Sequence, residues 1–566
     1  MSELPEQVLL AVRHLSVDFT LRTHVLHAVR DVSFDLKRGT TTCLVGESGS
    51  GKSVSSRALL RLVDRPGRIT QGEILLRDGA GFTDLAQLPP AGRAIRAVRG
   101  KRIGLIFQEP MSSLSPVHTI GSQIAEAVRL HTGLDRRAAR LRVIELLRHV
   151  EIADPGRMFD RYAFEFSGGM RQRAIIAMAL AGEPDILIAD EPTTALDVTT
   201  QAEILDLIKR LQAERGMAML LITHDMGIVA EVADEVAVMR FGRIVEQGPV
   251  DRIFHDAEHP YTRRLLGATR KLEQSGVAGR AGSAEPILSV RGLGKVFPGR
   301  RQWFGSKGGD FRAVQDASFD LYAGESLGIV GESGSGKTTL GRMILRTIEP
   351  SEGTIEYRQR NGRVIDVRGL GKEGLRAYHR DVRLVFQDPF ASLNPRLTVK
   401  QVIGDPLAIA GLAQGRGLDR RVAELMELVG LDPAAMERYP HAFSGGQRQR
   451  IGIARALALD PRIIIADEAT SALDVSIRSQ ILDLLLELQQ RLGLSYLFIA
   501  HDISVVRYFC HRVAVMHRGR IVEIGEAARI CSAPVEPYTR SLISAVPNPD
   551  PRAKRMLHRH RFAETV

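Results

Sequence analysis

Two glycine-rich segments carry the residue types that hold phosphate groups. They read GESGSGKS from Gly46 to Ser53 and GESGSGKT from Gly331 to Thr338, and each follows a short apolar run. Glycine lets successive backbone N–H groups converge on a phosphate, and Lys52 and Lys337 would reach its β- and γ-phosphates. The segments therefore predict two nucleoside-triphosphate sites. The predicted nucleotide-binding residues are Gly46, Glu47, Ser48, Gly49, Ser50, Gly51, Lys52, Ser53, Gly331, Glu332, Ser333, Gly334, Ser335, Gly336, Lys337, Thr338 and Thr339.

An acidic pair ends a second apolar run in each half of the chain. The pairs are Asp190-Glu191 and Asp467-Glu468. The first carboxylate, at the end of a buried strand, can hold Mg²⁺ directly or through water. The second faces the other way, where it can orient and polarise the water that attacks the γ-phosphate. The predicted metal ligands are Ser53, Thr338, Asp190 and Asp467, and the predicted catalytic carboxylates are Glu191 and Glu468.

A histidine follows each acidic pair at a constant distance. The spacing from Glu191 to His224 is identical to the spacing from Glu468 to His501. Each histidine follows an apolar run, which places it at the sheet edge where the nucleotide is expected. An imidazole there can hydrogen-bond both the γ-phosphate and the catalytic glutamate. A lone histidine would more often be structural, but this repeated spacing favours a catalytic role for both.

A Ser-Gly-Gly sequence opens an arginine-rich helix in each half. A serine hydroxyl and glycine N–H groups at a helix start form an anion site, aided by the helix dipole. Each half already has its own phosphate loop, so this second site is expected to serve the ATP bound by the other half. The residues concerned are Ser167, Gly168, Gly169, Ser444, Gly445 and Gly446.

These motifs recur because the chain contains one module twice. All motifs from Ser-Gly-Gly onward repeat at one constant offset, whereas the glycine-rich segments repeat at a slightly larger one. Insertions and deletions are thus confined to the N-terminal part of a module of roughly 270 residues. The predicted parts are a first module (1–270), a Gly/Ala/Ser-rich linker (271–286), a second module (287–550) and a basic tail (551–566). The tail shows no apolar helical face and is expected to be solvated and disordered, or to contact a membrane surface or a partner.

The apolar runs predict strands buried on both faces of a mostly parallel sheet, because they are short and do not alternate. A different spacing, with apolar residues three or four apart, lies between Gln108 and Ser167 and predicts an inserted helical subdomain. The predicted fold class is α/β, with two tandem P-loop nucleoside triphosphatase domains. The strands are expected at Thr41–Val45, Ile103–Phe107, Ile186–Asp190 and Ala218–Thr223. The helical positions are Ile120, Ile124, Val128, Leu141, Ile144 and Leu147, with Val422, Leu425 and Val429 in the second module.

Charge, cysteine content and the length of the apolar runs exclude several classes of protein. The 566 residues carry a net charge of +11 and 44% hydrophobic residues, which is typical of a globular protein with anionic partners. The three cysteines show no metal-ligand spacing, which argues against a disulfide scaffold, a zinc site and an iron–sulfur cluster. No apolar run approaches the length that a membrane span requires, and the N-terminus shows no signal sequence. We therefore expect a cytoplasmic protein without a membrane span.

Six motifs in the same order, twice, make the chain resemble an ABC-transporter ATPase with two fused nucleotide-binding domains. By this resemblance the glycine-rich segments are Walker A loops, the acidic pairs end the Walker B strands, and Ser-Gly-Gly is the signature. The resemblance also implies Q-loop residues that contact nucleotide and metal, Gln108 and Gln387, and D-loop residues, Asp197 and Asp474. Its implied cofactors are ATP and Mg²⁺.

The segments HPYTR (His259–Arg263) and PYTR (Pro537–Arg540) resemble the C-terminal part of peptide and nickel importer ATPases. FSGG in place of LSGG is also similar to that branch. The resemblance implies an import motor at the cytoplasmic face of the inner membrane. Its partners would be two transmembrane permease subunits, docked near Gln108 and Gln387, and an extracytoplasmic solute-binding protein. No nucleic-acid partner is expected.

Dipeptides or oligopeptides are the expected cargo, with glutathione, a nickel chelate, opines or another small solute as alternatives. A tandem ATPase acting on ribosomes is a distant alternative, because such proteins join their modules by a long charged helix and this linker is short and glycine-rich. Two departures from the family pattern stand out. Met170 replaces glutamine in the first signature, and the usual adenine-stacking tyrosine is missing, with Phe19 and Phe297 as candidate substitutes.

Overall fold

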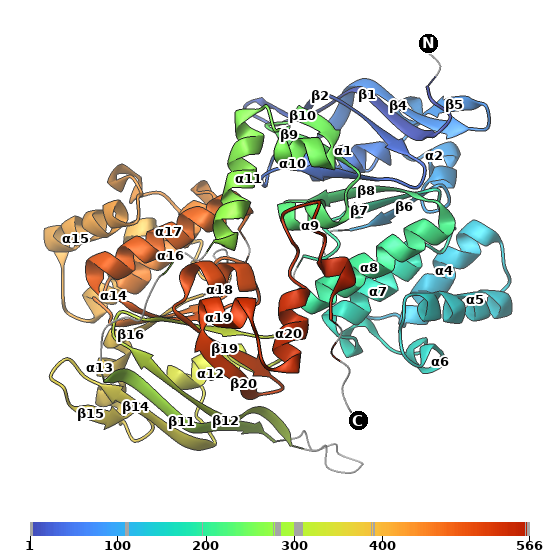
Figure 1. The fold of residues 1–566 in the computed structure, drawn as a ribbon. Coiled ribbons are helices and arrows are strands. Elements are labelled where there is room, and N and C mark those ends of the chain that lie inside the picture. Colours follow the sequence, from blue (N-terminus) through green and yellow to red (C-terminus); the bar gives the residue numbers. More distant parts are fainter. Residues whose placement is uncertain are drawn as a thin grey trace. The chain divides into compact units, whose positions relative to one another are not determined.

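The computed structural model describes residues 4–107, 113–194, 196–274, 277, 285–298, 310–386, 388, 391–471, 473–560 and 562 (Figure 1). The chain forms two compact units. Unit 1 comprises Met1–Thr269 and Pro547–Arg559, and unit 2 comprises Arg270–Val546 and His560–Val566. Among the described residues, no helix is both long and apolar enough to cross a membrane.

A six-stranded sheet forms the centre of unit 1. Its strand order is β10-β9-β3-β8-β7-β6, and neighbouring strands are parallel except for β9 and β10. Every residue of β3, β7 and β8 is buried, as expected for strands covered on both faces. The predicted mostly parallel core is therefore confirmed. The strands are β3 (Thr41–Val45), β6 (Ile103–Ile106), β7 (Ile186–Asp190), β8 (Ala218–Thr223), β9 (Glu235–Arg240) and β10 (Arg243–Pro249).

A second, antiparallel sheet of unit 1 was not predicted from the sequence. Its strand order is β2-β1-β4-β5, and its inner side chains share one hydrophobic core with the central sheet, as Leu10 and Leu44 illustrate. The hydrophobic core therefore lies between two sheets. Because β3 is packed into this core, the start of the loop that follows β3 is held in place. The strands are β1 (Val8–Thr20), β2 (Val25–Lys37), β4 (Gly67–Asp78) and β5 (Gly81–Asp84).

The predicted helical insertion of unit 1 is present. Thr119 and Asp135 cap its first two helices, each accepting a hydrogen bond from a backbone N–H of the first turn. One expected apolar position differs, because Leu141 is 64% exposed and the second helix buries Val143 and Leu146 instead. The helices are α4 (Ile120–Thr132), α5 (Arg136–His149), α6 (Pro155–Met158) and α7 (Gly168–Ala179).

The remaining helices of unit 1 follow strands and loops of the two sheets. The α-helices are α1 (Lys52–Leu59), α2 (Arg93–Val98), α8 (Val198–Arg215), α9 (Met226–Val232), α10 (Val250–His255) and α11 (Pro260–Glu273). Two 3₁₀ helices are η1 (Leu85–Gln87) and η2 (Ala163–Glu165). The last residues of α11 overlap the start of the predicted linker, and most of that linker lies outside the described residues.

Unit 2 repeats this architecture. Its sheets have the orders β16-β17-β18-β13-β19-β20 and β12-β11-β14-β15. The strands are β11 (Pro286–Phe297), β12 (Phe311–Tyr322), β13 (Ser326–Val330), β14 (Glu352–Arg358), β15 (Val364–Asp366), β16 (Val382–Val385), β17 (Ile463–Asp467), β18 (Ser495–Ile499), β19 (Arg512–His517) and β20 (Arg520–Glu526). The helices are α12 (Lys337–Ile344), α13 (Lys372–Asp381), α14 (Val399–Ile409), α15 (Gly415–Leu428), α16 (Gly445–Leu457), α17 (Val475–Leu492), α18 (Ile503–Phe509), α19 (Ala527–Ser532), α20 (Pro537–Ser544), η3 (Pro433–Ala435) and η4 (Pro440–Ala442).

Residues Pro547–Arg559, here called the closing segment, follow the second module in sequence but belong to unit 1. They contain η5 (Met556–His558). Glu231 on α9 is completely buried, and its Oε1 atom accepts backbone N–H groups of Asn548, Arg555 and Met556, each at 3.0 Å. A buried carboxylate oxygen that receives three N–H donors is well satisfied, so these bonds hold the segment against α9.

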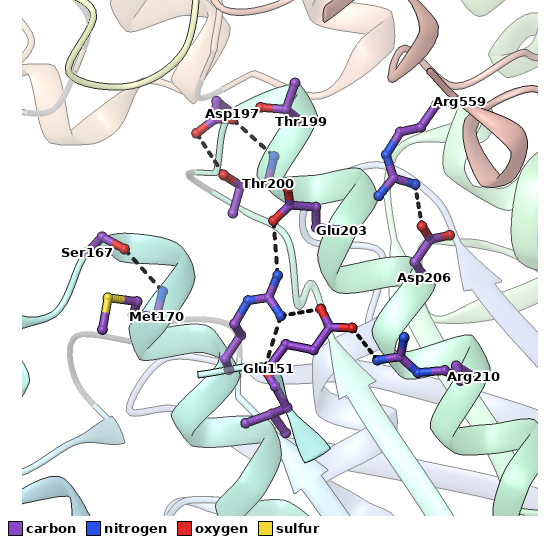
Figure 2. Close-up of polar contacts among 12 residues, drawn as sticks. Glu151, Ser167, Met170, Asp197, Thr199, Thr200, Glu203, Asp206, Arg210 and Arg559 are labelled. Atoms are coloured by element: carbon purple, nitrogen blue, oxygen red, sulfur yellow. Dashed lines mark hydrogen bonds and ion pairs between the residues drawn. The ribbon is translucent and has the colours of Figure 1, made fainter. Parts of the chain in front are cut away.

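Ion pairs add to this attachment. Arg552 donates two hydrogen bonds of 2.6 Å to Asp251 on α10, and Arg559 pairs with Asp206 on α8 (Figure 2). The structure thereby corrects the expectation of a solvated, disordered tail over 551–566, at least for the described residues up to Arg559. Its Arg552 and Arg559 side chains pair with acidic side chains of unit 1.

Candidate nucleotide-binding sites

In each unit the glycine-rich segment joins a central strand to a helix, β3 to α1 in unit 1 and β13 to α12 in unit 2. At the loop entry, Gly46 has a φ of 152°, and a Cβ atom there would lie 2.2 Å from the backbone oxygen of Met239. Gly331 repeats this with a φ of 154° and a 2.1 Å approach to Met516. Glycine is therefore required at this position, because the opposing atom is backbone.

The lysine of each segment reaches back across its own loop. The Lys52 Nζ atom donates hydrogen bonds to the carbonyl oxygens of Gly46 and Glu47 at 2.7 and 2.9 Å. The Lys337 Nζ atom contacts the two equivalent carbonyls at 2.7 Å each. Both lysines are 5% exposed. Their ammonium groups are thus fixed within the loops, where a compact positive charge suits a phosphate.

A hydroxyl and an aspartate meet beside each loop. The Ser53 Oγ atom donates to Asp190 at 3.1 Å, and the Thr338 Oγ1 atom donates to Asp467 at 3.2 Å. Burial raises the pKa of both aspartates, although the hydroxyl hydrogen bond acts in the opposite direction. Among the described residues, no group of three or more His, Cys, Asp and Glu side chains could hold a metal. The two oxygens fit an Mg²⁺ ion that takes further oxygens from phosphate and water.

The next carboxylate points to the histidine. Glu191 has a left-handed φ of 48°, and its Oε1 atom lies 3.0 Å from the Nδ1 atom of His224. Glu468 has a φ of 47°, and its Oε2 atom lies 3.3 Å from the Nδ1 atom of His501. Backbone strain of this kind costs about 1 kcal/mol or more and is found at functional sites. Other equivalent pairs of non-glycine residues also have a positive φ, so the contact with the histidine, and not the strain, favours the catalytic assignment of the glutamates.

The charge state of Glu468 follows from its neighbours. Burial acts to raise its pKa, but the hydrogen bond and charge of His501 and the charge of Lys337 outweigh burial, so the pKa lies below its ordinary value. The carboxylate is therefore ionised at neutral pH and can accept a hydrogen bond from water. Glu468 thus lies within electrostatic range of Lys337, Asp467 and His501.

Each Ser-Gly-Gly starts a helix. Ser167 caps α7 by accepting the N–H of Met170 at 3.3 Å (Figure 2), and Ser444 caps α16 by accepting the N–H of Gln447 at 3.3 Å. In unit 2 the Gln447 side chain also accepts the backbone N–H of Ser444 at 3.0 Å, which completes a capping box. Met170 has no oxygen for this bond. Both serines are exposed, so each is accessible to a ligand.

The two predicted D-loop aspartates also cap helices. Asp197 starts α8, where it accepts the N–H and hydroxyl groups of Thr200 at 3.0 and 3.1 Å and the Thr199 hydroxyl at 2.6 Å (Figure 2). Asp474 starts α17 and accepts the N–H of Ile477 at 3.1 Å. Each aspartate is thereby held rigidly, at the same spacing after its acidic pair in both units.

The structure assigns no role to four of the predicted site residues. Gln108 and Gln387 lie outside the described residues, so their roles stay predictions. Phe19 lies on β1 and packs against the hydrophobic core of unit 1. Phe297, at the end of β11, is 38% exposed, with the Lys295 Nζ atom 5.3 Å from its ring centroid. Neither contact assigns an adenine-stacking residue.

Comparison with known proteins identifies the class. Residues 29–194 and 314–471 match the ABC transporter family. The chain therefore belongs to the ABC transporter ATPases and carries two fused ABC domains. Residues 245–303 and 522–564 match the oligopeptide/dipeptide transporter C-terminal region, which places the chain in the importer branch that the HPYTR and PYTR segments predicted.

Two relatives of nearly the same length support this placement. The glutathione import ATP-binding protein GsiA of Salmonella typhimurium (strain LT2) is 49% identical over 98% of this chain and 92% of its own length. The protein of the same name from Shigella flexneri is 48% identical over the same shares. Among solved structures, the ATP-binding cassette MJ0796 bound to ADP and Pi matches 43% of this chain and 99% of its own, with 29% identity and a TM-score of 0.37.

Proposed function

We propose that this chain is the motor subunit of an ABC importer that hydrolyses ATP in both of its modules. One observation carries the proposal. The same cluster of loop lysine, hydroxyl–aspartate pair, strained glutamate and histidine is built in each unit, with matching contacts. Two intact clusters favour two hydrolytic sites over one hydrolytic and one degenerate site.

The residues divide the chemistry between them. The loop and Lys52 bind and orient the phosphates in unit 1, and Ser53 with Asp190 would hold Mg²⁺, which neutralises developing charge on the phosphates. Glu191 aligns the attacking water and accepts its hydrogen bond. His224 holds the glutamate at 3.0 Å and can donate to the γ-phosphate. Lys337, Thr338, Asp467, Glu468 and His501 take the same roles in unit 2.

The exposed Ser-Gly-Gly sites complete the proposal. Each signature would bind the γ-phosphate of ATP held by the other module, so that ATP binding draws the modules together and hydrolysis releases them. Gln108 and Gln387 would sense nucleotide and metal, and Asp197 and Asp474 would be the D-loop residues. Because both modules share one chain, their effective concentration is of order millimolar for a flexible linker.

A pocket of about 850 Å³ in unit 2 supports docking of a permease. It is lined by residues of β16, α13, α14 and α16. Ile409, at its rim, is 87% exposed. An apolar contact among positive charges suits a permease segment with apolar and acidic side chains. The arginines that line the pocket are Arg376, Arg380, Arg383 and Arg455.

We infer a peripheral position at the cytoplasmic face of the inner membrane, with two permease subunits and an extracytoplasmic solute-binding protein as partners. Short peptides are the proposed cargo, supported by the match to the oligopeptide/dipeptide transporter C-terminal region. Glutathione is the leading alternative, because similar proteins carry glutathione import in their names. Nickel chelates and opines have less support.

Phosphate release by Glu191→Gln and Glu468→Gln variants tests the two-site motor. Each single substitution is expected at least to halve turnover, and the double variant to lose about 100-fold or more, as for removal of a general base. Glu214→Gln, at an exposed position on α8, is the matched control. A single variant with wild-type turnover would show that its site does not hydrolyse ATP.

Reconstitution tests the cargo. The chain would be assembled with its permease in lipid vesicles with binding protein present, and ATP turnover measured with dipeptides, glutathione and a nickel chelate. Stimulation by dipeptides is expected. Stimulation by glutathione alone selects the alternative cargo, and stimulation by the chelate alone overturns the peptide proposal.

A further inference from the structure

The tyrosines of the two Pro-Tyr-Thr-Arg sequences, Pro260–Arg263 and Pro537–Arg540, have no part in the hydrolytic cluster described above. Tyr261 lies at the start of α11 and Tyr538 at the start of α20. Both side chains are 2% exposed. In sequence, each tyrosine comes after the last strand of its module. A buried tyrosine hydroxyl needs a hydrogen-bond partner, so the location of that partner indicates the function of the residue.

In both units the partner is the phosphate loop. The Tyr261 hydroxyl accepts the backbone N–H of Glu47 at 3.0 Å, and the Tyr538 hydroxyl accepts the backbone N–H of Glu332 at 3.1 Å. The partners are 214 and 206 residues apart in sequence. The same long-range contact therefore forms twice.

The contact falls on the peptide group that the lysine holds. The N–H of Glu47 and the carbonyl of Gly46 belong to one peptide group, and that carbonyl accepts Lys52 Nζ at 2.7 Å. Tyrosine and lysine therefore hold opposite edges of one peptide plane. Because Gly46 tolerates many backbone conformations, this plane would otherwise rotate easily. In unit 2, Lys337 makes the equivalent 2.7 Å bond.

Each tyrosine is itself held in place from another direction. Glu246 on β10 accepts the N–H groups of Glu258 and His259 at 2.7 and 3.2 Å, just before α11. Glu523 on β20 accepts the two equivalent N–H groups before α20 at 3.1 and 3.2 Å. The start of each helix is thus fixed to the central sheet, so the tyrosine contacts the loop from a rigid support.

The ring contacts differ between the units, whereas the hydroxyl contact does not. The Arg240 guanidinium lies 4.9 Å from the Tyr261 ring centroid. At the corresponding position of unit 2, the His517 ring stacks on Tyr538 at 4.0 Å and 13°. The packing around the ring has therefore changed between the two copies, and the hydroxyl bond to the loop is what they share.

We propose that Tyr261 and Tyr538 are positioning residues for ATP. Each hydroxyl fixes the peptide plane that orients the loop lysine and so keeps the loop in its phosphate-binding shape. The segments that match the oligopeptide/dipeptide transporter C-terminal region thereby contribute a residue to each nucleotide site. The proposal rests on the proposed function, in which these loops bind ATP.

Steady-state kinetics of Tyr261→Phe, Tyr538→Phe and the double variant, in the full chain, test this role. Loss of one hydrogen bond is expected to raise the KM for ATP about fivefold in the double variant, with kcat within about twofold of wild type. The Kd for ATP, measured with EDTA present to prevent hydrolysis, should rise in parallel. An unchanged KM and Kd would overturn the proposal.

Tyr496→Phe is the matched control, because that buried hydroxyl donates to the Leu485 carbonyl at 3.2 Å, away from the loop. It should lower thermal stability while leaving the KM unchanged. Amide hydrogen exchange without nucleotide gives a second readout, in which Glu47 and Glu332 should exchange faster in the Phe variants. Unchanged exchange would also overturn the proposal, whereas a wild-type chain that binds no ATP would refute the proposed function instead.

Discussion

At the scale of single residues, Asp190 and Asp467 are buried acids that sit beside a glutamate and a phosphate loop. Burial is the main reason for their raised pKa, and the adjacent glutamates act in the same direction, while the hydroxyl neighbours and nearby Lys and Arg side chains lower it. Their charge is therefore unfavourable without a cation. A divalent ion would relieve this cost, which couples stability to metal and nucleotide.

This coupling predicts a defined pH dependence. A raised pKa means that the folded state holds the proton more tightly than the unfolded state, so stability falls as pH rises above the ordinary value of 3.8 and through the folded-state pKa. In EDTA at pH 7, Asp190→Asn with Asp467→Asn should melt at a higher temperature than wild type. Thermal unfolding across pH measures this.

Two further measurements test whether the buried charge is the cause of this difference in melting temperature. The gain in melting temperature should shrink as the pH falls through the raised folded-state pKa, because the wild-type aspartates then become neutral as well. Mg²⁺ with ATP should stabilise the wild type more than the variant. A variant that melts below wild type in EDTA at pH 7 would contradict the assigned charge cost.

Residue types and order predicted the loop lysines, acidic pairs and histidines, because each motif is local in sequence and is repeated. The targets of Tyr261 and Tyr538 were not predictable. The Pro-Tyr-Thr-Arg sequences can be recognised, but the N–H groups that the tyrosines contact lie more than 200 residues away and belong to the backbone, which carries no sequence signal.

At the scale of elements, strands buried on both faces were predicted well and the half-exposed sheet was missed. The apolar runs predicted the observed bounds of β3 and β7. Every residue of these strands is buried, so a continuous apolar run marks the whole strand and no alternation of apolar and polar residues has to be recognised. In β1 the pairing register shifts between Val12 and Leu15, and His14 has a φ of 51°. Such a bulge interrupts the period-two pattern by which an antiparallel strand is recognised.

The first signature helix offers a prediction at this scale. Met170→Gln should complete the capping box that Gln447 makes in unit 2, and one added hydrogen bond is worth about 0.5 to 1 kcal/mol. Urea unfolding, followed by hydrogen exchange of α7, measures the gain. Gln447→Met is the reciprocal variant and should lose a similar amount from α16. Equal stability of both variants and wild type would show that the box contributes nothing.

At the scale of the whole molecule, repeated motifs predicted two modules but not the assignment of the closing segment to unit 1. This stretch is basic and has few apolar residues, so it resembles a solvated tail. Its attachment depends on backbone N–H groups that meet Glu231 and on two buried side chains, Pro551 and Met556. Neither feature gives a periodic pattern.

Met556→Ala tests which unit depends on this segment. Met556 is completely buried, and truncation of such a side chain costs about 2 kcal/mol or more. Amide exchange should accelerate in α9 of unit 1 and not in its counterpart α18 of unit 2. Met426→Ala, at an equally buried methionine on α15 of unit 2, is the control and should leave exchange of α9 unchanged. Faster exchange confined to α18 in Met556→Ala would contradict the assignment.

The closing segment also separates the boundary of the gene duplication from the boundary of the folded unit. A gene cut at the linker would encode a first half that lacks the residues covering Glu231, and a second half that carries them without their binding surface. Recombination between relatives at the linker would join one protein's first module to another's closing segment. Hybrids should therefore be more successful when the exchange includes the last residues of the chain together with the first module.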